Sequence, residues 1–226
     1  MRKAVLNFIT FSIMLLLSVG AQAQYKVKVA CVGNSITEGA GLKTTYPQAL
    51  QELLGEEYEV RNYGIGGRTL LKKGDYPYWI EAKYTEVLNW NPDVVIIKLG
   101  TNDTKPQNWK YKENFVEDYV ALVKSFKNLP SKPKVYICKP LPVFEDKWGI
   151  TERIVKEEIL PAINKIARKT KVETIDLYTP FLGKAALTYD GVHPNEEGAA
   201  LLAKEVNEAL ITFKEAKAKK VLSKKQ

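Results

Sequence analysis

The sequence predicts an α/β fold built on a five-stranded, doubly wound parallel sheet. Five short apolar runs rich in β-branched residues alternate with amphipathic segments along the chain. The segments between the runs are long enough to form the helical, right-handed crossovers that parallel strands require. Three of the runs are almost continuously apolar, which is typical of strands covered on both faces. No internal repeat or interdomain linker interrupts this pattern, so we expect one domain.

The predicted strands cover residues 26–32, 58–63, 93–100, 134–140 and 172–177. Cys31 and Cys138 each lie within one of these apolar runs. In the expected sheet they lie on strands two positions apart, which separates them by about 10 Å. A disulfide requires Cα atoms closer than about 7 Å, so we expect two buried free thiols.

The amphipathic segments predict five helices, which cover residues 46–55, 79–90, 113–126, 153–169 and 195–213. Gly55 suits the C-cap of the first of these helices. Pro161 lies inside the fourth helix, where it predicts a kink or a break. Pro194 precedes the last helix and suits its first turn, and Glu196 and Glu197 lie near its positive end.

Both ends of the chain differ from this domain in composition. Residues 1–23 carry Arg2 and Lys3 before an apolar stretch and end in a small-x-small cleavage pattern, which predicts a secretory signal peptide. The alternative is an uncleaved membrane anchor, although about 20 apolar residues are needed to span a bilayer. We expect a domain at residues 24–213 and a Lys-rich tail at 214–226. The protein is then secreted or periplasmic, bacterial, and without a stable membrane anchor after cleavage.

The formal net charge of +8 is concentrated at the two ends of the chain. Two basic residues lie in the leader, and the tail contains six lysines and one glutamate. The region between them is nearly neutral, so it lacks the basic face typical of nucleic-acid binding. We therefore expect no nucleic-acid partner, and the sequence leaves the oligomeric state open.

Four polar motifs lie where a predicted strand ends or a helix begins. They are GNSIT at 33–37, NYGIGGRT at 62–69, GTND at 100–103 and DGVHPN at 190–195. In doubly wound sheets, ligands bind beyond the carboxyl ends of the strands. Each motif taken singly also fits an ordinary turn. Four of them in this order indicate a functional site.

Through these motifs the chain resembles the SGNH, or GDSL-like, esterase and lipase family over nearly all of residues 26–213. The resemblance implies a flavodoxin-like, three-layer α/β/α sandwich and serine-dependent ester hydrolysis. It also implies that Ser35 is the nucleophile, and that Asp190 and His193 complete a catalytic triad.

The same resemblance implies an oxyanion hole formed by the backbone N–H groups of Ser35 and Gly67 and by the side-chain amide of Asn102. Such donors stabilise the charge that develops on the carbonyl oxygen during acyl transfer. The family commonly has aspartate before the serine, whereas this chain has Asn34. Asparagine keeps the shape and hydrogen-bonding capacity of aspartate but removes a negative charge.

The residue types support this chemistry without the family. A serine hydroxyl becomes nucleophilic when a neighbouring base takes its proton, and histidine suits that role near neutral pH. His193 is the only histidine of the chain, so a histidine-assisted reaction must use it. Asp190 lies three residues earlier, beyond Gly191, and its carboxylate can orient the imidazole through Nδ1–H. The alternative is an Asp-Gly turn before a Pro-started helix.

Aromatic residues in the predicted loops indicate a sugar substrate. We select Tyr76, Trp79 and Trp109 as candidate substrate-binding residues, and Trp148 lies in a further loop. The alternative is that such residues close the edges of the core. No long apolar helix or lid-like segment offers a groove for a fatty acyl chain, so we expect a small-molecule or glycan ester with a short acyl group, first of all acetyl. The resemblance is to the branch of sialate and polysaccharide O-acetylesterases.

Two other functions remain open. A lysophospholipase or thioesterase uses the same triad, and a non-catalytic carbohydrate-binding module can keep the fold without needing a base. We expect no cofactor, because GIGG at 64–67 lacks the full spacing of a dinucleotide-binding loop. We also expect no metal, because one histidine and two cysteines on predicted strands form no recognisable zinc ligand set.

Overall fold

The structure, a computed structural model, describes residues 25–211, 213 and 215. Its five strands form one parallel sheet in the order β2-β1-β3-β4-β5. The strands are β1 (Val27–Gly33), β2 (Tyr58–Gly64), β3 (Val94–Lys98), β4 (Lys134–Lys139) and β5 (Glu173–Asp176). The predicted doubly wound, flavodoxin-like sheet is therefore confirmed, and every strand ends within two residues of its expected bounds.

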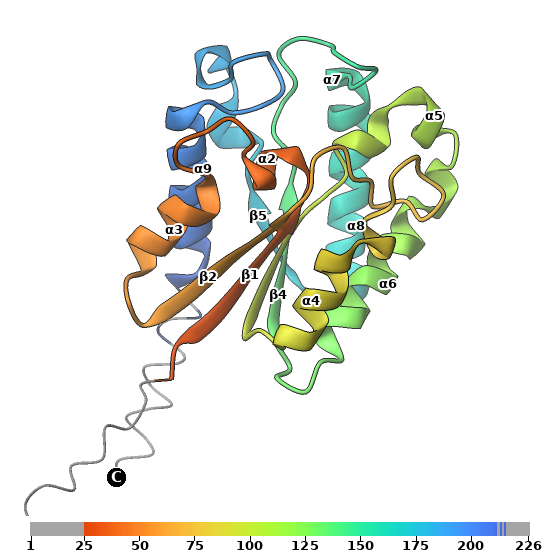
Figure 1. Ribbon diagram of the computed structural model, residues 1–226. Helices are drawn as coiled ribbons and strands as arrows, with labels where there is room; N and C mark the ends of the chain where they lie inside the picture. Colours follow the sequence, from red (N-terminus) through yellow and green to blue (C-terminus); the bar gives the residue numbers. More distant parts are fainter. Residues whose placement is uncertain (1–24, 212, 214, 216–226) are drawn as a thin grey trace, which may run out of the picture.

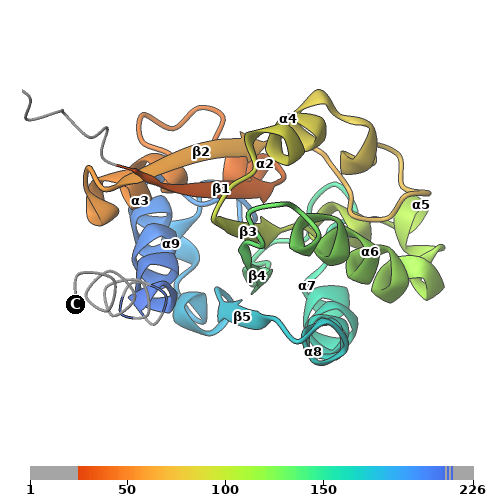
Figure 2. The same ribbon diagram turned by 90° about the horizontal axis from the view of Figure 1, so that it is seen from below.

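Helices cover both faces of this sheet, which gives the three predicted layers. The helices are α2 (Ser35–Glu38), α3 (Tyr46–Leu54), α4 (Ala82–Trp90), α5 (Pro106–Trp109), α6 (Phe115–Lys127), α7 (Glu152–Ile154), α8 (Leu160–Thr170) and α9 (Glu196–Ala209). Figures 1 and 2 show α3 and α9 on one face and α4, α6 and α8 on the other.

Two expected helices differ in detail. The helix expected from residue 79 begins at Ala82, because residues 78–80 form a separate 3₁₀ turn. The helix expected at 153–169 contains the π-helical stretch Val155–Ile159 just before Pro161. Proline lacks a backbone N–H and its ring crowds the preceding turn, and a π-helical turn accommodates both effects without ending the helix. The regular hydrogen bonding is interrupted, as expected, but the chain stays helical.

The strands alternate their side chains between two cores. On β3, Val94 and Ile96 face the α3 and α9 side, and Val95 and Ile97 face the other side; all four are buried. This burial on both faces explains the continuous apolar runs of the sequence.

The two cysteines are buried and free, as predicted. Cys31 lies on β1 and Cys138 on β4, with β3 between them. Burial raises the pKa of each thiol to about 12, so both stay protonated and unreactive.

The predicted leader at 1–23 lies outside the described residues, and so does the predicted tail at 214–226 except for Glu215. Among the residues that the structure describes, no helix is both long enough and apolar enough to cross a membrane.

Candidate active site

The first polar motif forms a tight turn between β1 and the short helix α2. A Cβ atom on Gly33 would lie 2.0 Å from the Thr37 hydroxyl oxygen, so no larger residue fits there. Asn34 caps α2, because its side-chain oxygen accepts the backbone N–H of Ile36 at 3.2 Å. An aspartate would use the same oxygen for this cap, so the asparagine preserves the turn. Ser35 therefore begins a helix directly beyond the carboxyl end of β1.

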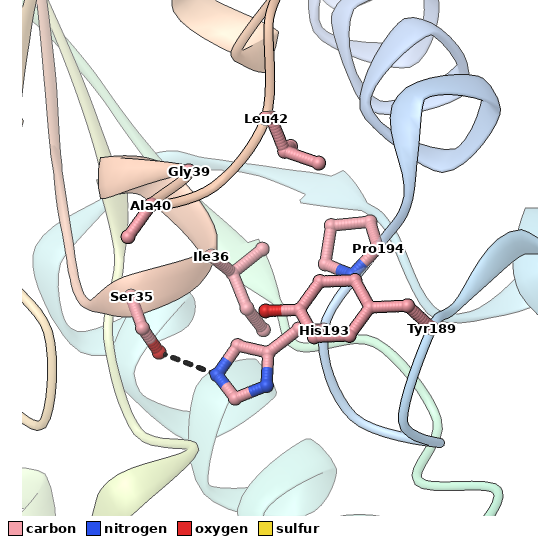
Figure 3. A pocket seen from close by; sticks show the side chains of 8 residues that line it. All are labelled: Ser35, Ile36, Gly39, Ala40, Leu42, Tyr189, His193 and Pro194. Atoms are coloured by element: carbon pink, nitrogen blue, oxygen red, sulfur yellow. Dashed lines mark hydrogen bonds between the residues drawn. The ribbon is translucent and has the colours of Figure 1, made fainter.

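Ser35, His193 and Asp190 form a continuous line of polar contacts. The Oγ atom of Ser35 lies 2.9 Å from Nε2 of His193, and Figure 3 shows the two side chains directed at each other. The Nδ1 atom of His193 lies 2.7 Å from Oδ2 of Asp190. A carboxylate at this distance favours the tautomer with the proton on Nδ1, which leaves Nε2 free to accept the serine proton.

The environment of Asp190 favours its ionised form. Partial burial raises the pKa of this carboxyl, but hydrogen bonds from the backbone N–H groups of His193 and Val192 and from the His193 ring outweigh burial and lower it. The two backbone bonds, at 2.7 and 2.9 Å, both end on Oδ1. The second oxygen is thus kept for the imidazole.

The segment that carries Asp190 and His193 is both a turn and a helix start. Gly191 has a φ of +83°, and a Cβ atom there would lie 2.5 Å from Cβ of Glu145. Asn195 caps α9 by accepting the backbone N–H of Gly198 at 3.0 Å. The turn and the polar contact chain are therefore not alternatives, because the turn is what brings the carboxylate to the imidazole.

The two other predicted oxyanion donors lie in the loops after β2 and β3. Gly67 has a φ of +76°, and a Cβ atom there would meet no atom within 4 Å. Its neighbour Gly66 lies beside the serine, since a Cβ atom on Gly66 would be 3.9 Å from Cβ of Ser35. Asn102 is 4% exposed and donates one amide hydrogen to the Arg68 carbonyl at 3.1 Å. An amide has a second hydrogen to donate, which the predicted oxyanion role requires.

Asp103, which the sequence analysis did not select, connects these two loops. It is fully buried and accepts the backbone N–H groups of Leu70 at 3.0 Å and Leu71 at 2.7 Å. Burial raises the pKa of Asp103 to about 6, although these two hydrogen bonds oppose the shift. The feature of the sequence that could have indicated Asp103 is its position directly after Asn102 in the GTND motif.

Lys98, the last residue of β3, is a second buried charge that was not selected. It pairs with Gly33 across the sheet and is 1% exposed, and among the described residues its amine has no hydrogen-bond partner. Burial lowers its pKa to about 7, and the nearby Cys138 opposes this shift. A lysine inside an otherwise apolar strand was the signal in the sequence.

The predicted substrate-binding aromatic residues have different surroundings. Trp109 is 9% exposed, donates its indole N–H to Glu158 at 2.9 Å and packs against Phe115. Its ring therefore belongs to the core and does not line the hollow beside Ser35.

Trp79 is partly buried against that same core, and its indole N–H donates to the Leu70 carbonyl at 2.7 Å. Tyr76 is exposed and lies against the guanidinium of Arg68. Neither residue lines the hollow beside Ser35.

That hollow adjoins Ser35 and His193 and has a volume of about 180 Å³. Its lining residues are Ser35, Ile36, Gly39, Ala40, Leu42, Tyr189, His193 and Pro194 (Figure 3). Most of the wall is apolar. Tyr189, which directly precedes the Asp190 motif, was not selected from the sequence, and Figure 3 shows its ring beside the imidazole. Within the described part of the chain, no group of three or more His, Cys, Asp or Glu residues is arranged to hold a metal ion.

Comparison with known proteins gives a family match and a curated relative. The family model of the GDSL-like lipase/acylhydrolase family matches residues 31–201. An acetylxylan esterase from Xylanibacter ruminicola is 37% identical over 215 residues, which is 85% of this chain and 45% of the relative. The chain therefore spans less than half the length of that protein.

Solved structures share the fold. An acetyl xylan esterase, AlAXEase, is 25% identical with a TM-score of 0.68, over 82% of this chain and 100% of the other. Est24, a carbohydrate acetylesterase from Sinorhizobium meliloti, is 22% identical with a TM-score of 0.65, over 83% of this chain and 100% of the other. A catalytic mutant of Axe2, an acetylxylan esterase from Geobacillus stearothermophilus, is 22% identical with a TM-score of 0.63, over 81% of this chain and 94% of the other.

Proposed function

The chain belongs to the GDSL-like lipase/acylhydrolase family, and we propose that it is a serine esterase that removes acetyl groups from carbohydrates. The observation that carries the proposal is the contact of Ser35 Oγ with His193 Nε2 at 2.9 Å, combined with the contact of His193 Nδ1 with Asp190 at 2.7 Å. A binding module has no need of a serine hydroxyl held against an oriented imidazole.

In the proposed reaction, Ser35 Oγ attacks the carbonyl carbon of the acetyl ester while His193 Nε2 takes the hydroxyl proton. The backbone N–H groups of Ser35 and Gly67 and the amide of Asn102 stabilise the negative oxygen of the tetrahedral intermediate. The bond from the carbonyl carbon to the sugar oxygen then breaks, and the imidazolium returns its proton to that oxygen. The alcohol leaves, and the acetyl group stays on Ser35.

A water molecule completes the cycle. His193 takes a proton from the water as its oxygen attacks the acetyl carbonyl, and a second tetrahedral intermediate forms. The bond from the carbonyl carbon to Ser35 Oγ then breaks, the imidazolium returns the proton to Oγ, and acetic acid leaves and ionises to acetate. Asp190 stays ionised throughout and stabilises the positive imidazole.

The lining of the hollow supports a short acyl group. Its apolar wall residues Ile36, Ala40 and Leu42 suit a methyl group more than a long chain that needs an extended groove. A lysophospholipase or long-chain thioesterase is therefore the second candidate.

The names of the relatives support a carbohydrate as the alcohol part of the ester. The Xylanibacter ruminicola relative is an acetylxylan esterase, and the proposal extends an acetylated polysaccharide substrate from that protein to this chain. The predicted signal peptide at 1–23 extends the proposal: the protein acts outside the cytoplasm, where such polymers are found. The test is the N-terminal residue of the secreted protein, which should lie near Gln24; recovery only as an intact chain in the cytoplasm contradicts it.

The decisive experiment measures acetate release from a panel of acetylated glycans. We expect the wild type to release acetate from at least one glycan class, and Ser35→Ala to release none. Ser125→Ala is the matched control, because Ser125 lies on α6 with its hydroxyl bonded to the Leu122 carbonyl at 2.8 Å. If the wild type hydrolyses no activated ester and Ser35 resists a fluorophosphonate probe, the carbohydrate-binding module is the better interpretation.

A chain-length series separates the two esterase candidates. We expect kcat/KM on p-nitrophenyl esters to be highest for acetate and to fall steadily toward decanoate. A maximum at C8–C10 contradicts the acetylesterase and favours the lysophospholipase or thioesterase.

A further inference from the structure

Trp148 has an unusual backbone conformation at the tip of a two-residue hairpin. The turn is closed by backbone hydrogen bonds between Lys147 and Ile150 in both directions, at 3.2 and 2.7 Å. Its central residues Trp148 and Gly149 have φ values of 53° and 79°. Positive φ at both central positions is the pattern of a type I′ turn, where asparagine and glycine are preferred. A large aromatic residue at the first of these positions carries backbone strain.

Core packing does not explain this tryptophan. Its side chain is 59% exposed, one of the most exposed large apolar residues of the described chain. Backbone strain of this kind destabilises the fold and persists mainly at functional positions.

The hairpin is held firmly against the active-site segment. The Phe144 N–H donates to the Gly191 carbonyl at 2.8 Å, and Gly191 packs closely on Glu145. At the tip, a Cβ atom on Gly149 would lie 2.7 Å from Cδ of Pro106. The position of the Trp148 ring relative to His193 is therefore set by the fold.

Two exposed aromatic rings flank the imidazole of His193. The Trp148 ring centroid lies 5.5 Å from that of His193 at an interplanar angle of 61°. The Tyr189 ring is nearly parallel to the imidazole, with an angle of 11° and centroids 5.7 Å apart. Figure 3 shows this ring beside the imidazole. Tyr189 is 58% exposed, so both rings also present surface to the solvent.

We propose that Trp148 and Tyr189 form a pyranose-binding subsite for the sugar that carries the ester. The proposal rests on the proposed esterase function. Because His193 Nε2 must return its proton to the sugar oxygen, the sugar ring has to lie beside the imidazole, where these two rings are exposed. The C–H face of a pyranose is apolar and packs on an aromatic face, while its hydroxyl rim stays hydrated. The strained turn is thus kept because it aims an indole at the leaving group.

The test replaces Trp148 with the residue that the turn prefers. Trp148→Asn should leave the melting temperature equal or higher, because strain is relieved. It should lower kcat/KM for an acetylated xylo-oligosaccharide about ten-fold more than for p-nitrophenyl acetate. The ratio of kcat/KM for the oligosaccharide to kcat/KM for p-nitrophenyl acetate should therefore fall about ten-fold. Trp148→Phe, which keeps a ring, should recover part of this loss. Tyr189→Leu should also lower the ratio.

Lys132→Asn is the matched control. Lys132 is an exposed non-glycine residue with a φ of 50° just before β4, so this variant relieves similar strain without removing a ring. We expect the ratio of the two kcat/KM values to stay at the wild-type level.

A binding measurement separates the subsite from the chemistry. In the Ser35→Ala background, the oligosaccharide should change the tryptophan fluorescence, and adding Trp148→Asn should remove that change. The subsite is overturned if Trp148→Asn lowers kcat/KM equally on both substrates. It is also overturned if this variant lowers the melting temperature and leaves the ratio of the two kcat/KM values unchanged. If the wild type releases no acetate, the proposed function is contradicted instead. In that case a fluorescence change on sugar binding still supports the subsite, and no fluorescence change overturns the subsite.

Discussion

Asp190 contacts His193 at two places with two different oxygens. Oδ1 accepts the backbone N–H of His193 at 2.7 Å, and Oδ2 lies 2.7 Å from Nδ1 of the ring. One carboxylate therefore shapes the turn and orients the side chain that the turn presents. This dual use explains why three residues of spacing are enough to build the Asp–His pair.

Replacing Asp190 should separate these two effects. Asp190→Asn keeps an oxygen for the backbone bonds but places an amide against Nδ1, so we expect kcat to fall by roughly 10⁴-fold through the wrong tautomer. Asp190→Ala also loses the backbone hydrogen bonds, so its free energy of unfolding should be about 1–3 kcal/mol lower than that of Asp190→Asn. Esterase kinetics and urea unfolding check both values.

The pH dependence of stability gives an independent check on Asp190. Its pKa is lower in the folded state than the ordinary value, so its ionised form stabilises the fold above about pH 4. This contribution is lost as the pH falls through the folded-state value. The stability difference between wild type and Asp190→Asn should therefore shrink in acid, and a difference that grows there contradicts the assignment.

Asn102→Ala should reduce kcat by about 10²- to 10³-fold, because one donor to the oxyanion is lost. KM for p-nitrophenyl acetate should change much less, since the donor acts mainly in the transition state. Asn128→Ala is the control, because Asn128 is exposed at the end of α6, away from the carboxyl edge of the sheet. Wild-type kcat in Asn102→Ala would remove this residue from the oxyanion hole.

Asp103→Ala should lower both stability and activity. It leaves the N–H groups of Leu70 and Leu71 buried without acceptors, at a cost of about 2 kcal/mol or more. The loop that carries Gly67 then loses its attachment to the loop after β3, so kcat should fall as well. Asp118→Ala is the control, since Asp118 accepts the N–H of the exposed Lys72 on the same segment at 3.0 Å. Reduced stability with full activity would limit Asp103 to a structural role.

Lys98→Met should stabilise the protein at pH 7. The folded-state pKa of Lys98 is about 7, against about 10.4 for an unfolded lysine. Between these values the unfolded chain binds more protons, so stability rises with pH, and the cost of burying the lysine is largest at pH 7 and below. We expect the melting temperature of Lys98→Met to rise by at least about 2 °C at pH 7.

The gain from Lys98→Met should shrink toward pH 10. The exposed Lys124 on α6 provides the control variant Lys124→Met, which should change the melting temperature neither at pH 7 nor at pH 10. A Lys98→Met protein that is less stable at every pH would show that the amine has a favourable buried partner.

Local signals predicted the elements well but did not indicate how exposed each aromatic residue is. Strand runs such as 93–100 were recognisable because both faces of a parallel strand are buried, whichever helices cover them. Trp109 and Trp148 both lie in segments that the sequence predicts as loops, yet one is 9% and the other 59% exposed. Their sequences do not distinguish them, because exposure depends on which other loops pack against each ring. Asp103 and Lys98 were overlooked for the same reason, since a charge becomes notable only once its burial is known.

The residue order alone was enough for the parallel α/β fold, through local periodicity and the rule that parallel strands end at one edge of the sheet. The resemblance of its motifs to a known family, supported by the chemistry of the side chains, indicated Ser35, Asp190 and His193 as the candidate reacting groups. Tertiary structure decided what lies around them: the contact between Ser35 and His193 across 158 residues of chain, the attachment of one loop by Asp103, and the two rings beside the imidazole. Distances between loops are set by the packing of the whole sheet and its helices, and no short stretch of sequence contains that information.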